Sequence, residues 1–266
     1  MNNRPTASAL LDILAATKRI SLVGVLGWQD VRARYRRSAL GPFWITLSMG
    51  IIIGTIGVVF GQIFKSPMHE FLPFLTIGLI LWGFINAVIT EGATGFISAD
   101  HIIKQLPIPM FVHIMRMIWR NLLILLHNLV IFPIVLLVFG KSLGWVALLS
   151  IPGLALGILN LSWMALLLAI VCARYRDLPQ MVTNVLQVLF YLTPVMWMPK
   201  LLPPDAALYL LDFNPVYHLI EITRAPLLGV APSATNWVIA GALAVVGWIV
   251  ALFVFGRYRR RIAYWL

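Results

Sequence analysis

Long apolar stretches separated by short polar or basic segments dominate the chain. Six of these stretches contain no Asp, Glu, Lys or Arg and reach, or nearly reach, the about 20 residues that a membrane-spanning helix needs. They are Leu40–Phe64, Phe71–Thr90, Asn121–Phe139, Ser142–Ala173, Leu178–Pro199 and Thr235–Gly256. A transmembrane barrel would instead show shorter segments of alternating polarity. The pattern therefore predicts an all-α polytopic membrane protein with six transmembrane helices.

The residues before the first stretch form a different pattern. Between Leu22 and Tyr35, apolar residues recur at roughly helical spacing, and a cluster of arginines lies around them. This spacing predicts an N-terminal amphipathic helix that lies on the membrane surface. Two roles stay open for it at this point, which are an anchor to lipid headgroups and a docking surface for a partner.

Two connecting segments also have distinct patterns. Ser98–Pro109 predicts a short helix that ends at the Pro-Ile-Pro sequence. Lys200–Gly229 is too apolar for a soluble loop and is divided by four prolines. We expect two short re-entrant helices in it, at about Asp205–Leu211 and Val216–Leu227. Non-helical backbone at membrane depth must be buried in protein or line a water-filled cavity, so this segment points to a translocation path.

The basic residues give the predicted spans a direction. With the N-terminus in the cytoplasm, 16 of the 20 Lys and Arg residues fall on the cytoplasmic side. The outer side then holds Lys65, Lys141, Lys200 and Arg224. The positive-inside rule therefore predicts that both termini are cytoplasmic. We expect one domain over 1–266, with a cytoplasmic amphipathic segment (1–39), a six-helix membrane domain (40–256) and a cytoplasmic basic tail (257–266).

Composition agrees with a membrane protein and narrows the functional classes. Hydrophobic residues make up 61% of the chain and charged residues 11%, against about 25% charged residues in a soluble domain. The net charge of +11 does not indicate a nucleic-acid partner, because the bases lie at the edges of apolar stretches. The single cysteine, Cys172, excludes an internal disulfide. We find no spacing typical of a catalytic, nucleotide or metal site, and expect neither an enzyme nor a bound cofactor.

A few polar and small residues inside the spans could have a function. Glu91 is expected to pair with Arg116 or Arg120. His127 could serve a proton-coupled carrier, although no Asp or Glu lies deep in a span to partner it. In the first span, small residues form one stripe that predicts close helix packing within the chain, with a dimer contact as the alternative. The stripe consists of Gly50, Gly54, Gly57 and Gly61.

Seven short runs follow one another along the chain: Asp30–Trp44, Gly78–Phe84, Ile103–Pro109, Arg174–Leu178, Tyr191–Val195, Asn214–Pro215 and Ile220–Gly229. Together and in this order, they resemble the membrane subunits of polysaccharide and polyol-phosphate exporters of the type-2 ABC transporter family. The run Arg36–Trp44 is most similar to O-antigen (lipopolysaccharide) export permeases of Gram-negative bacteria.

The resemblance implies a function and a set of partners. Two copies of the chain would form a channel for lipid-linked polysaccharide in the bacterial inner membrane, and two ATP-binding cassette subunits would bind ATP and Mg and drive export. Alternative substrates are capsule polysaccharide, teichoic acid, or a small hydrophobic drug or lipid. An intramembrane enzyme is a further alternative, disfavoured because no catalytic set is present.

The resemblance and the sequence pattern also nominate site residues. The expected interface with the ATPase subunit comprises Trp28, Asp30, Arg32, Arg34, Tyr35, Arg36, Arg37, Asp100, His101 and Lys104. A cytoplasmic loop contributes Arg174, Arg176 and Asp177. Candidate glycan-stacking residues of the channel are Trp82, Phe84, Trp163, Phe190, Tyr191 and Trp197, for which lipid contact or core packing is the alternative. The expected periplasmic gate comprises Asn214, Pro215, Tyr217, Glu221 and Arg224.

Overall fold

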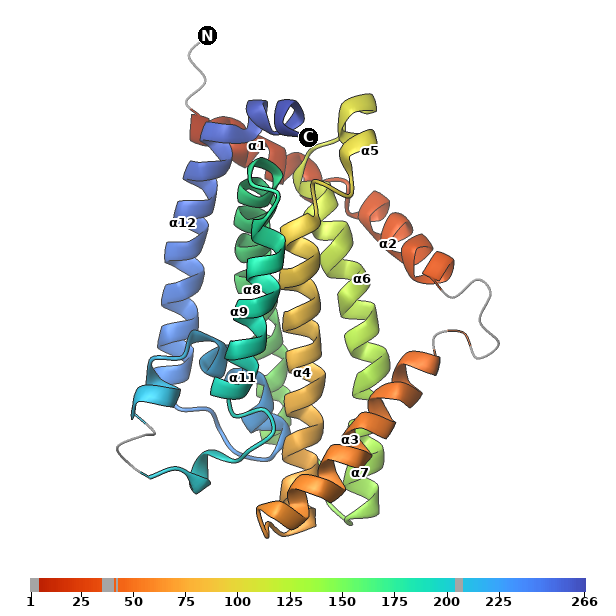
Figure 1. Cartoon of the computed structure of the whole chain (residues 1–266), viewed down its shortest axis with the longest axis vertical. Helices are drawn as coiled ribbons and strands as arrows, with labels where there is room; N and C mark the ends of the chain where they lie inside the picture. The colour runs from red at the N-terminus through yellow and green to blue at the C-terminus, as the bar shows by residue number, and fades with distance from the viewer. Residues whose placement is uncertain (1–4, 35–40, 42, 204–207) are drawn as a thin grey trace.

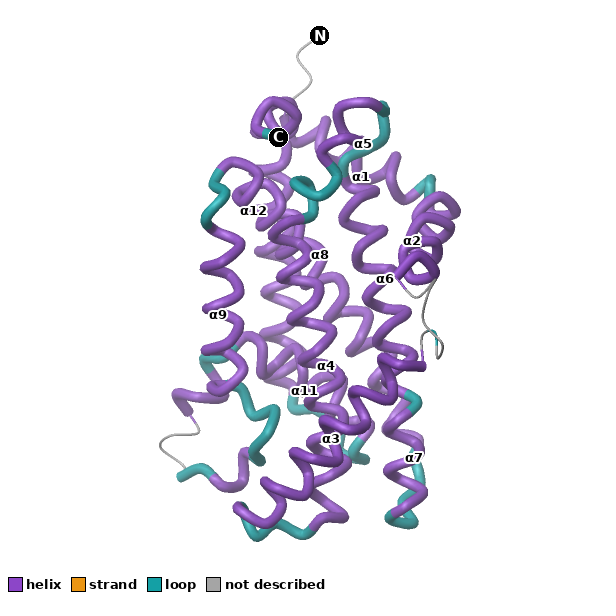
Figure 2. Tube along the Cα trace, turned by 45° about the vertical axis from the view of Figure 1, so that its right-hand side comes forward, coloured by secondary structure: helices purple, strands orange, loops and turns teal. Residues whose placement is uncertain are grey.

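A computed structural model describes residues 5–34, 41, 43–203 and 208–266, and shows an elongated bundle of helices (Figure 1). Helices occur along this whole part of the chain and strands do not (Figure 2). The elements are α1 (Pro5–Thr17), α2 (Ile20–Arg34), α3 (Phe43–Ile63), α4 (Met68–Thr94), α5 (Asp100–Gln105), α6 (Phe111–Leu129), α7 (Ile131–Val138), η1 (Trp145–Leu149), α8 (Ser150–Arg174), α9 (Leu178–Leu192), η2 (Pro199–Leu201), η3 (Leu208–Asp212), α11 (Pro215–Leu227) and α12 (Ala234–Trp265). The predicted all-α membrane fold is confirmed.

Five helical segments of the described residues are long and apolar enough to cross a membrane. They are Phe43–Ile63, Met68–Thr94, Phe111–Val138, Trp145–Arg174 and Ala234–Trp265. The sixth predicted span, Leu178–Pro199, forms α9 only as far as Leu192. Its helix ends there because Pro194 disfavours helical backbone at Thr193, which is extended. The count of six spans therefore stays a prediction.

Two helices continue beyond the boundaries that the sequence predicted for their spans. The third span was expected to begin at Asn121, but α6 begins at Phe111 and carries Arg116 and Arg120, both of which form ion pairs. The segment predicted as a cytoplasmic basic tail (257–266) continues α12 as far as Trp265, and its place outside the membrane stays a prediction. Pro133 separates α6 from α7, since a proline ring clashes with the carbonyl four residues before it.

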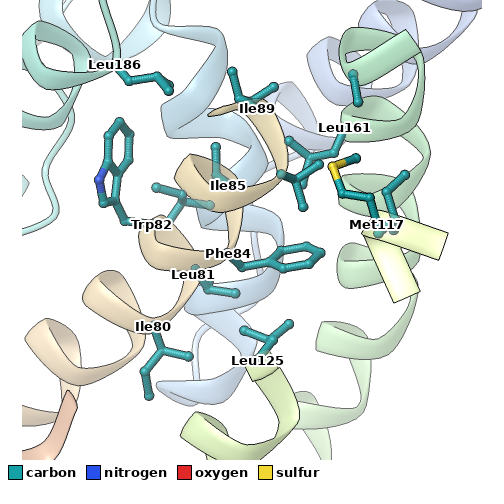
Figure 3. Packing of buried hydrophobic residues seen from close by; sticks show 14 of the residues in the cluster. Ile80, Leu81, Trp82, Phe84, Ile85, Ile89, Met117, Leu125, Leu161 and Leu186 are labelled. Atoms are coloured by element: carbon teal, nitrogen blue, oxygen red, sulfur yellow. The ribbon is translucent and has the colours of Figure 1, made fainter. Parts of the chain in front are cut away.

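Helix α4 lies at the centre of the bundle, and α3 lies at its edge. In the most apolar window of each helix, 78% of α4 residues but only 11% of α3 residues are buried. Ile85 and Ile89 of α4 lie beside Leu161 of α8 in the core (Figure 3). A Cβ atom on Gly92 would come within 2.9 Å of Ala165, so a small residue allows α4 and α8 this close approach.

Half of the predicted glycine stripe packs within the chain. A Cβ atom on Gly57 would approach Leu72, and one on Gly61 would approach Met68, both in α4. Gly50 and Gly54 have no atom within 4 Å of such a Cβ atom. The stripe therefore brings α3 onto α4 at one end of α3 and leaves the other end open.

The connecting segments form the short helices that were expected. Helix α5 ends at Gln105, before the two prolines, and α11 matches the second predicted re-entrant helix. The first, expected at Asp205–Leu211, is observed as η3 (Leu208–Asp212), with 204–207 outside the described residues. Helix α11 packs directly on α8, where a Cβ atom on Gly153 would lie 2.2 Å from the carbonyl oxygen of Ile222.

Candidate functional site

One end of the bundle gathers α1, α2, α5 and the last turns of α12, and we refer to it as the basic end (Figure 1). Asp12 of α1 anchors it. Its buried carboxylate accepts the backbone N–H groups of Met110 and Phe111, at 3.2 and 3.0 Å, and so caps α6 from another helix. It also lies 2.6 Å from Arg259 Nη2 of α12. Asp12 therefore fixes α1 to both α6 and α12.

A chain of ion pairs links α2 to the bundle. Arg116 donates to Asp30 of α2 from Nε (2.7 Å) and Nη2. Arg120 lies between two acids, with Nη1 3.3 Å from Asp30 and Nη2 2.6 Å from Glu91. Asn121 Nδ2 also donates to Glu91 at 2.5 Å. The predicted pairing of Glu91 with Arg120 is confirmed, and this ion-pair chain joins α2, α6 and α4.

A polar cavity of about 350 Å³ lies beside the ion-pair chain, between α2, α4, α5 and α6. His113 Nε2 and Arg120 Nε are buried there and have no hydrogen-bond partner in the part of the chain that the structure describes. A cavity of this size and polarity can hold several waters, each with two to four polar partners.

The expected ATPase-interface residues fall into two groups. Trp28, Arg32, His101 and Lys104 are exposed on α2 and α5, where a partner could reach them. Asp100 pairs with Lys104 at 2.9 Å. Asp30 is mostly buried in the ion-pair chain, so its observed contacts are within this chain. The side chain of Arg34, and Tyr35, Arg36 and Arg37, lie outside the described residues.

The predicted cytoplasmic loop lies at the basic end and contacts the end of α12. The Arg174 guanidinium lies 5.5 Å from the Trp265 ring centroid, in a cation–π arrangement. Arg176 Nη2 donates to the backbone oxygens of Trp265 and Leu266, each at 3.3 Å. Asp177 is exposed immediately before α9. This loop therefore joins α8 and α9 to α12.

Four of the candidate channel aromatics form a row that leads from the buried Trp82 to the exposed Tyr191. Trp82 and Phe190 have ring centroids 5.3 Å apart, Phe190 and Tyr191 are 5.4 Å apart, and Tyr191 is 60% exposed. Trp197 joins this row by donating from Nε1 to the Tyr191 carbonyl oxygen at 3.2 Å. Phe84 points into the core, away from Trp82 (Figure 3).

Trp163 is the remaining channel candidate, and it also packs between helices. A Cβ atom on Gly247 of α12 would lie 2.1 Å from its ring, and its Nε1 donates to Asn160 Oδ1 at 3.2 Å. In this conformation Phe84 and Trp163 pack between helices of this chain, and Trp163 also lines an apolar groove of about 510 Å³ beside α8 and α9. Their role in a channel stays a prediction.

Helix α9 carries a polar stripe on its exposed side. Gln180, Asn184, Gln187 and Tyr191 recur at helical spacing, and all four are exposed. Only Leu186 of α9 is buried. Polar side chains that face hydrocarbon are unfavourable, so this stripe indicates contact with water or another protein surface. Two of its members, Asn184 and Gln187, were noticeable in the sequence as polar residues inside a span.

The expected gate residues lie around the start and middle of α11. Asn214 Oδ1 accepts the N–H groups of Val216 and Tyr217, at 3.0 and 3.2 Å, and its Nδ2 donates to Thr193 Oγ1 at 2.9 Å. Asn214 is thus the N-cap of α11, and Pro215 follows in the first turn, where its missing N–H has no effect. The segment after α9 is therefore bound to α11.

Arg224 is fully buried and holds the same two segments together. Its Nη2 lies 2.6 Å from Glu221 Oε2, its Nη1 donates to the Pro194 carbonyl oxygen at 2.6 Å, and the guanidinium lies 4.0 Å from the Phe74 ring centroid. Together these contacts join α4, α11 and the segment after α9.

Sequence reasoning missed Asp12, Arg259 and the helix α1. Asp12 was recognisable as a lone acid among apolar residues, but its partners lie about 100 and 250 positions away in the sequence. His218 was also missed, and it is buried with Nδ1 2.8 Å from Asn236 Oδ1. No local pattern in the sequence identifies either contact.

Comparison with known proteins gives one family and a consistent set of relatives. The family model described as ABC-2 type transporter matches residues 21–228. Two proteins of Klebsiella pneumoniae named O-antigen export system permease protein RfbA are 22% and 23% identical to this chain, over 91% of it and 93% of each relative. A protein of the same name from Myxococcus xanthus is 22% identical over 74% of this chain and 76% of its own length. The matched residues include α2, α5, α9 and α11.

Proposed function

The chain belongs to the ABC-2 type transporter family, and we propose that it is the membrane subunit of an ATP-driven exporter of lipid-linked, O-antigen-like polysaccharide. The observation that carries the substrate class is the similarity, over nine-tenths of the chain, to O-antigen export permeases. Membership of this family makes the chain a transporter component rather than an enzyme. ATP hydrolysis, with its Mg, belongs in this proposal to a separate ATP-binding subunit.

The basic end is the proposed docking surface for that subunit. Exposed Trp28 and Arg32 of α2, and His101 and Lys104 of α5, offer aromatic and cationic contacts there. A movement of α2 would pass to α6 and α4 through the ion-pair chain. A movement of α5 would reach α4 through the short connection that joins them. Docking of an ATP-binding subunit at the basic end would require this end to lie in the cytoplasm. The excess of Lys and Arg residues on the predicted cytoplasmic side agrees with that orientation.

A homodimer forms the channel in this proposal. Helices α3 and α9 are the least buried of the long apolar elements, so a second copy can pack there. The polar stripe of α9 would then face a water-filled passage, and the Trp82–Phe190–Tyr191 row would border it. Sugar C–H faces pack on aromatic rings while sugar hydroxyls bond to amide side chains, and the stripe and the row supply both groups. The segment after α9 would complete the sixth crossing of the inner membrane.

Co-purification tests the partner. The tagged chain, expressed together with a candidate ATP-binding subunit, should retain that subunit, and lipid-linked glycan should stimulate ATP hydrolysis. Arg32→Glu together with Lys104→Glu should weaken the association. Lys65→Glu is the control and should not weaken it, because Lys65 is predicted to lie on the outer side of the membrane. Transport by the purified chain without an ATPase would contradict the proposal.

A deletion strain tests the substrate. Loss of the gene should remove surface polysaccharide. Sensitivity to hydrophobic drugs should be the same as in a strain that lacks the polysaccharide for another reason. A normal surface together with increased drug sensitivity would instead establish the small-molecule alternative. Complementation with the wild-type chain provides the control.

A further inference from the structure

An apolar groove of about 470 Å³ lies between the α1–α2 pair and helices α6, α8 and α12. It has no part in the proposed export path, whose polar stripe lies on α9. Ile20 and Leu159 on its edges are exposed, so the groove opens toward the surroundings of the protein. In Figure 1, α2 descends beside α6 from the junction with α1.

The groove does not need a polar occupant. Three of its polar side chains already have partners within the chain: Thr17 Oγ1 donates to the Leu14 carbonyl oxygen (3.0 Å), Ser162 Oγ to that of Ile158 (2.6 Å) and Trp248 Nε1 to that of Leu159 (3.1 Å). The remaining lining is almost entirely apolar. An occupant that made no hydrogen bonds would therefore leave none of these groups unpaired, as an acyl chain would.

The length of the groove matches one leaflet. On α6 its lining begins at Phe111 and ends at Leu122, which at 1.5 Å per residue corresponds to roughly 16 Å. One leaflet contributes about half of the ≈ 30 Å hydrocarbon core. The Phe111 end lies at the level of α1, because Asp12 binds the backbone N–H of Phe111. The groove therefore runs from the basic end to about the middle of the membrane.

Two cationic side chains lie at the Phe111 end. Thr17 and Ile20 line the groove, and Lys18 and Arg19 stand between them in the turn that joins α1 to α2. Both are exposed, and neither has an ion-pair partner among residues 5–34, 41, 43–203 and 208–266. Paired bases at the membrane surface attract anionic headgroups.

We propose that this groove binds one anionic glycerophospholipid, with an acyl chain along α6 and the phosphate at Lys18 and Arg19. The ion pairs of Asp12 with Arg259 and of Asp30 with Arg116 hold α1 and α2 against the bundle. The walls of the groove therefore cannot separate easily, and the lipid is a resident component of the structure rather than cargo in transit. This inference does not depend on the identity of the exported substrate.

Native mass spectrometry of the purified full chain tests the proposal. Phosphatidylglycerol or phosphatidylethanolamine is added stepwise to delipidated protein in detergent, and the retained lipid is counted. We expect one tightly bound phosphatidylglycerol per chain, and a roughly 30-fold lower affinity for phosphatidylethanolamine, as two surface bases would give.

Two variants distinguish the contribution of the headgroup to lipid binding from that of the acyl chain. Lys18→Gln with Arg19→Gln should remove the preference for phosphatidylglycerol, whereas Arg260→Gln with Arg261→Gln, also adjacent exposed bases, should not. Gly24→Leu should abolish tight retention of both lipids, because a Cβ atom on Gly24 meets no atom within 4 Å and the side chain would fill the groove. Gly54→Leu, equally unobstructed but on α3, is its control.

Three results would overturn the proposal. One is equal retention of both lipids by the wild-type chain. Another is unchanged retention in Gly24→Leu with an unchanged thermal midpoint. The third is a lipid-linked glycan or a second protein chain in place of the phospholipid in the spectrum.

Discussion

Asp12 allows a stringent test of how the basic end is held together. Its carboxylate is buried, accepts two backbone N–H groups of α6 and pairs with Arg259, which is 35% exposed. We compare Asp12→Ala, Asp12→Asn, Arg259→Met and the double variant Asp12→Asn with Arg259→Met. Each removes a different part of the arrangement: the cap and the charge, the charge alone, the cation alone, or both charges.

The expected free energies of unfolding follow from these contacts. Asp12→Ala loses a cap, at about 1–2 kcal/mol, and leaves Arg259 unpaired but near water, at about 1 kcal/mol or less. Asp12→Asn keeps an acceptor for α6 and should be about 1 kcal/mol less destabilised than Asp12→Ala. Arg259→Met leaves a buried carboxylate without its cation and should cost about 3 kcal/mol. The double variant should recover part of that loss, because no uncompensated buried charge remains.

Thermal or denaturant unfolding of the purified protein in one detergent measures these differences, followed by tryptophan fluorescence. Lys104→Gln, which breaks the exposed Asp100–Lys104 pair, is the control and should change the free energy of unfolding by less than about 0.5 kcal/mol. Additivity of Asp12→Asn and Arg259→Met within about 0.5 kcal/mol would refute the coupling described here.

Three further predictions concern packing, the channel face and the polar residue in α6. Gly153→Ala should destabilise the protein by about 1–3 kcal/mol, because its Cβ atom would meet the Ile222 carbonyl, whereas Gly157→Ala, one turn further along α8, should be neutral or stabilising in the same unfolding assay. The double variant Gln187→Leu with Asn184→Leu should reduce surface polysaccharide in a complemented deletion strain without lowering the thermal midpoint of the protein. Phe84→Ala, in the core, should instead lower the free energy of unfolding by about 3–5 kcal/mol. A lower thermal midpoint for the α9 variant would show that the stripe is a packing surface. His127→Ala should leave ATP-driven export and its pH profile unchanged, because ring nitrogen Nδ1 makes its hydrogen bond within its own helix, 2.8 Å from the Leu123 carbonyl oxygen. Loss of both would favour a proton-coupled carrier.

The sequence predicted elements whose signal is local. Apolar length gave α3, α4, α8 and α12, and the two prolines after α5 correctly marked its end. The span that contains α9 was expected to continue to Pro199, but the helix ends at Leu192. Charge was informative for Glu91 and Arg120, which lie on neighbouring antiparallel spans. Excluding charged residues from the spans placed the predicted start of the third span too late in the chain. An ionised arginine that has a nearby carboxylate, such as Arg116, can lie in a helix of the bundle.

The candidate site was less predictable because its contacts join distant segments. Trp82 and Phe84 are two positions apart on α4 and both are buried, yet Trp82 packs against an aromatic row that reaches the surface and Phe84 points to the other side of α4. This difference depends on which helices cover each face. Asp30 was expected on a docking surface, but two arginines of α6 pair with it. Such assignments require the arrangement of helices, which hydrophobic periodicity does not specify.

The bond between Asp12 and Arg259 also bears on how the protein is assembled in the membrane. Helix α1 leaves the ribosome before all the other described helices, and α12 leaves after them. During synthesis the carboxylate of Asp12 therefore lacks the Arg259 partner that it has in the completed protein. Completion of α12 supplies this cation, and α1 is then held to both α6 and α12. A chain that ended before α12 would leave this carboxylate without its cation and would hold α1 less firmly against the bundle.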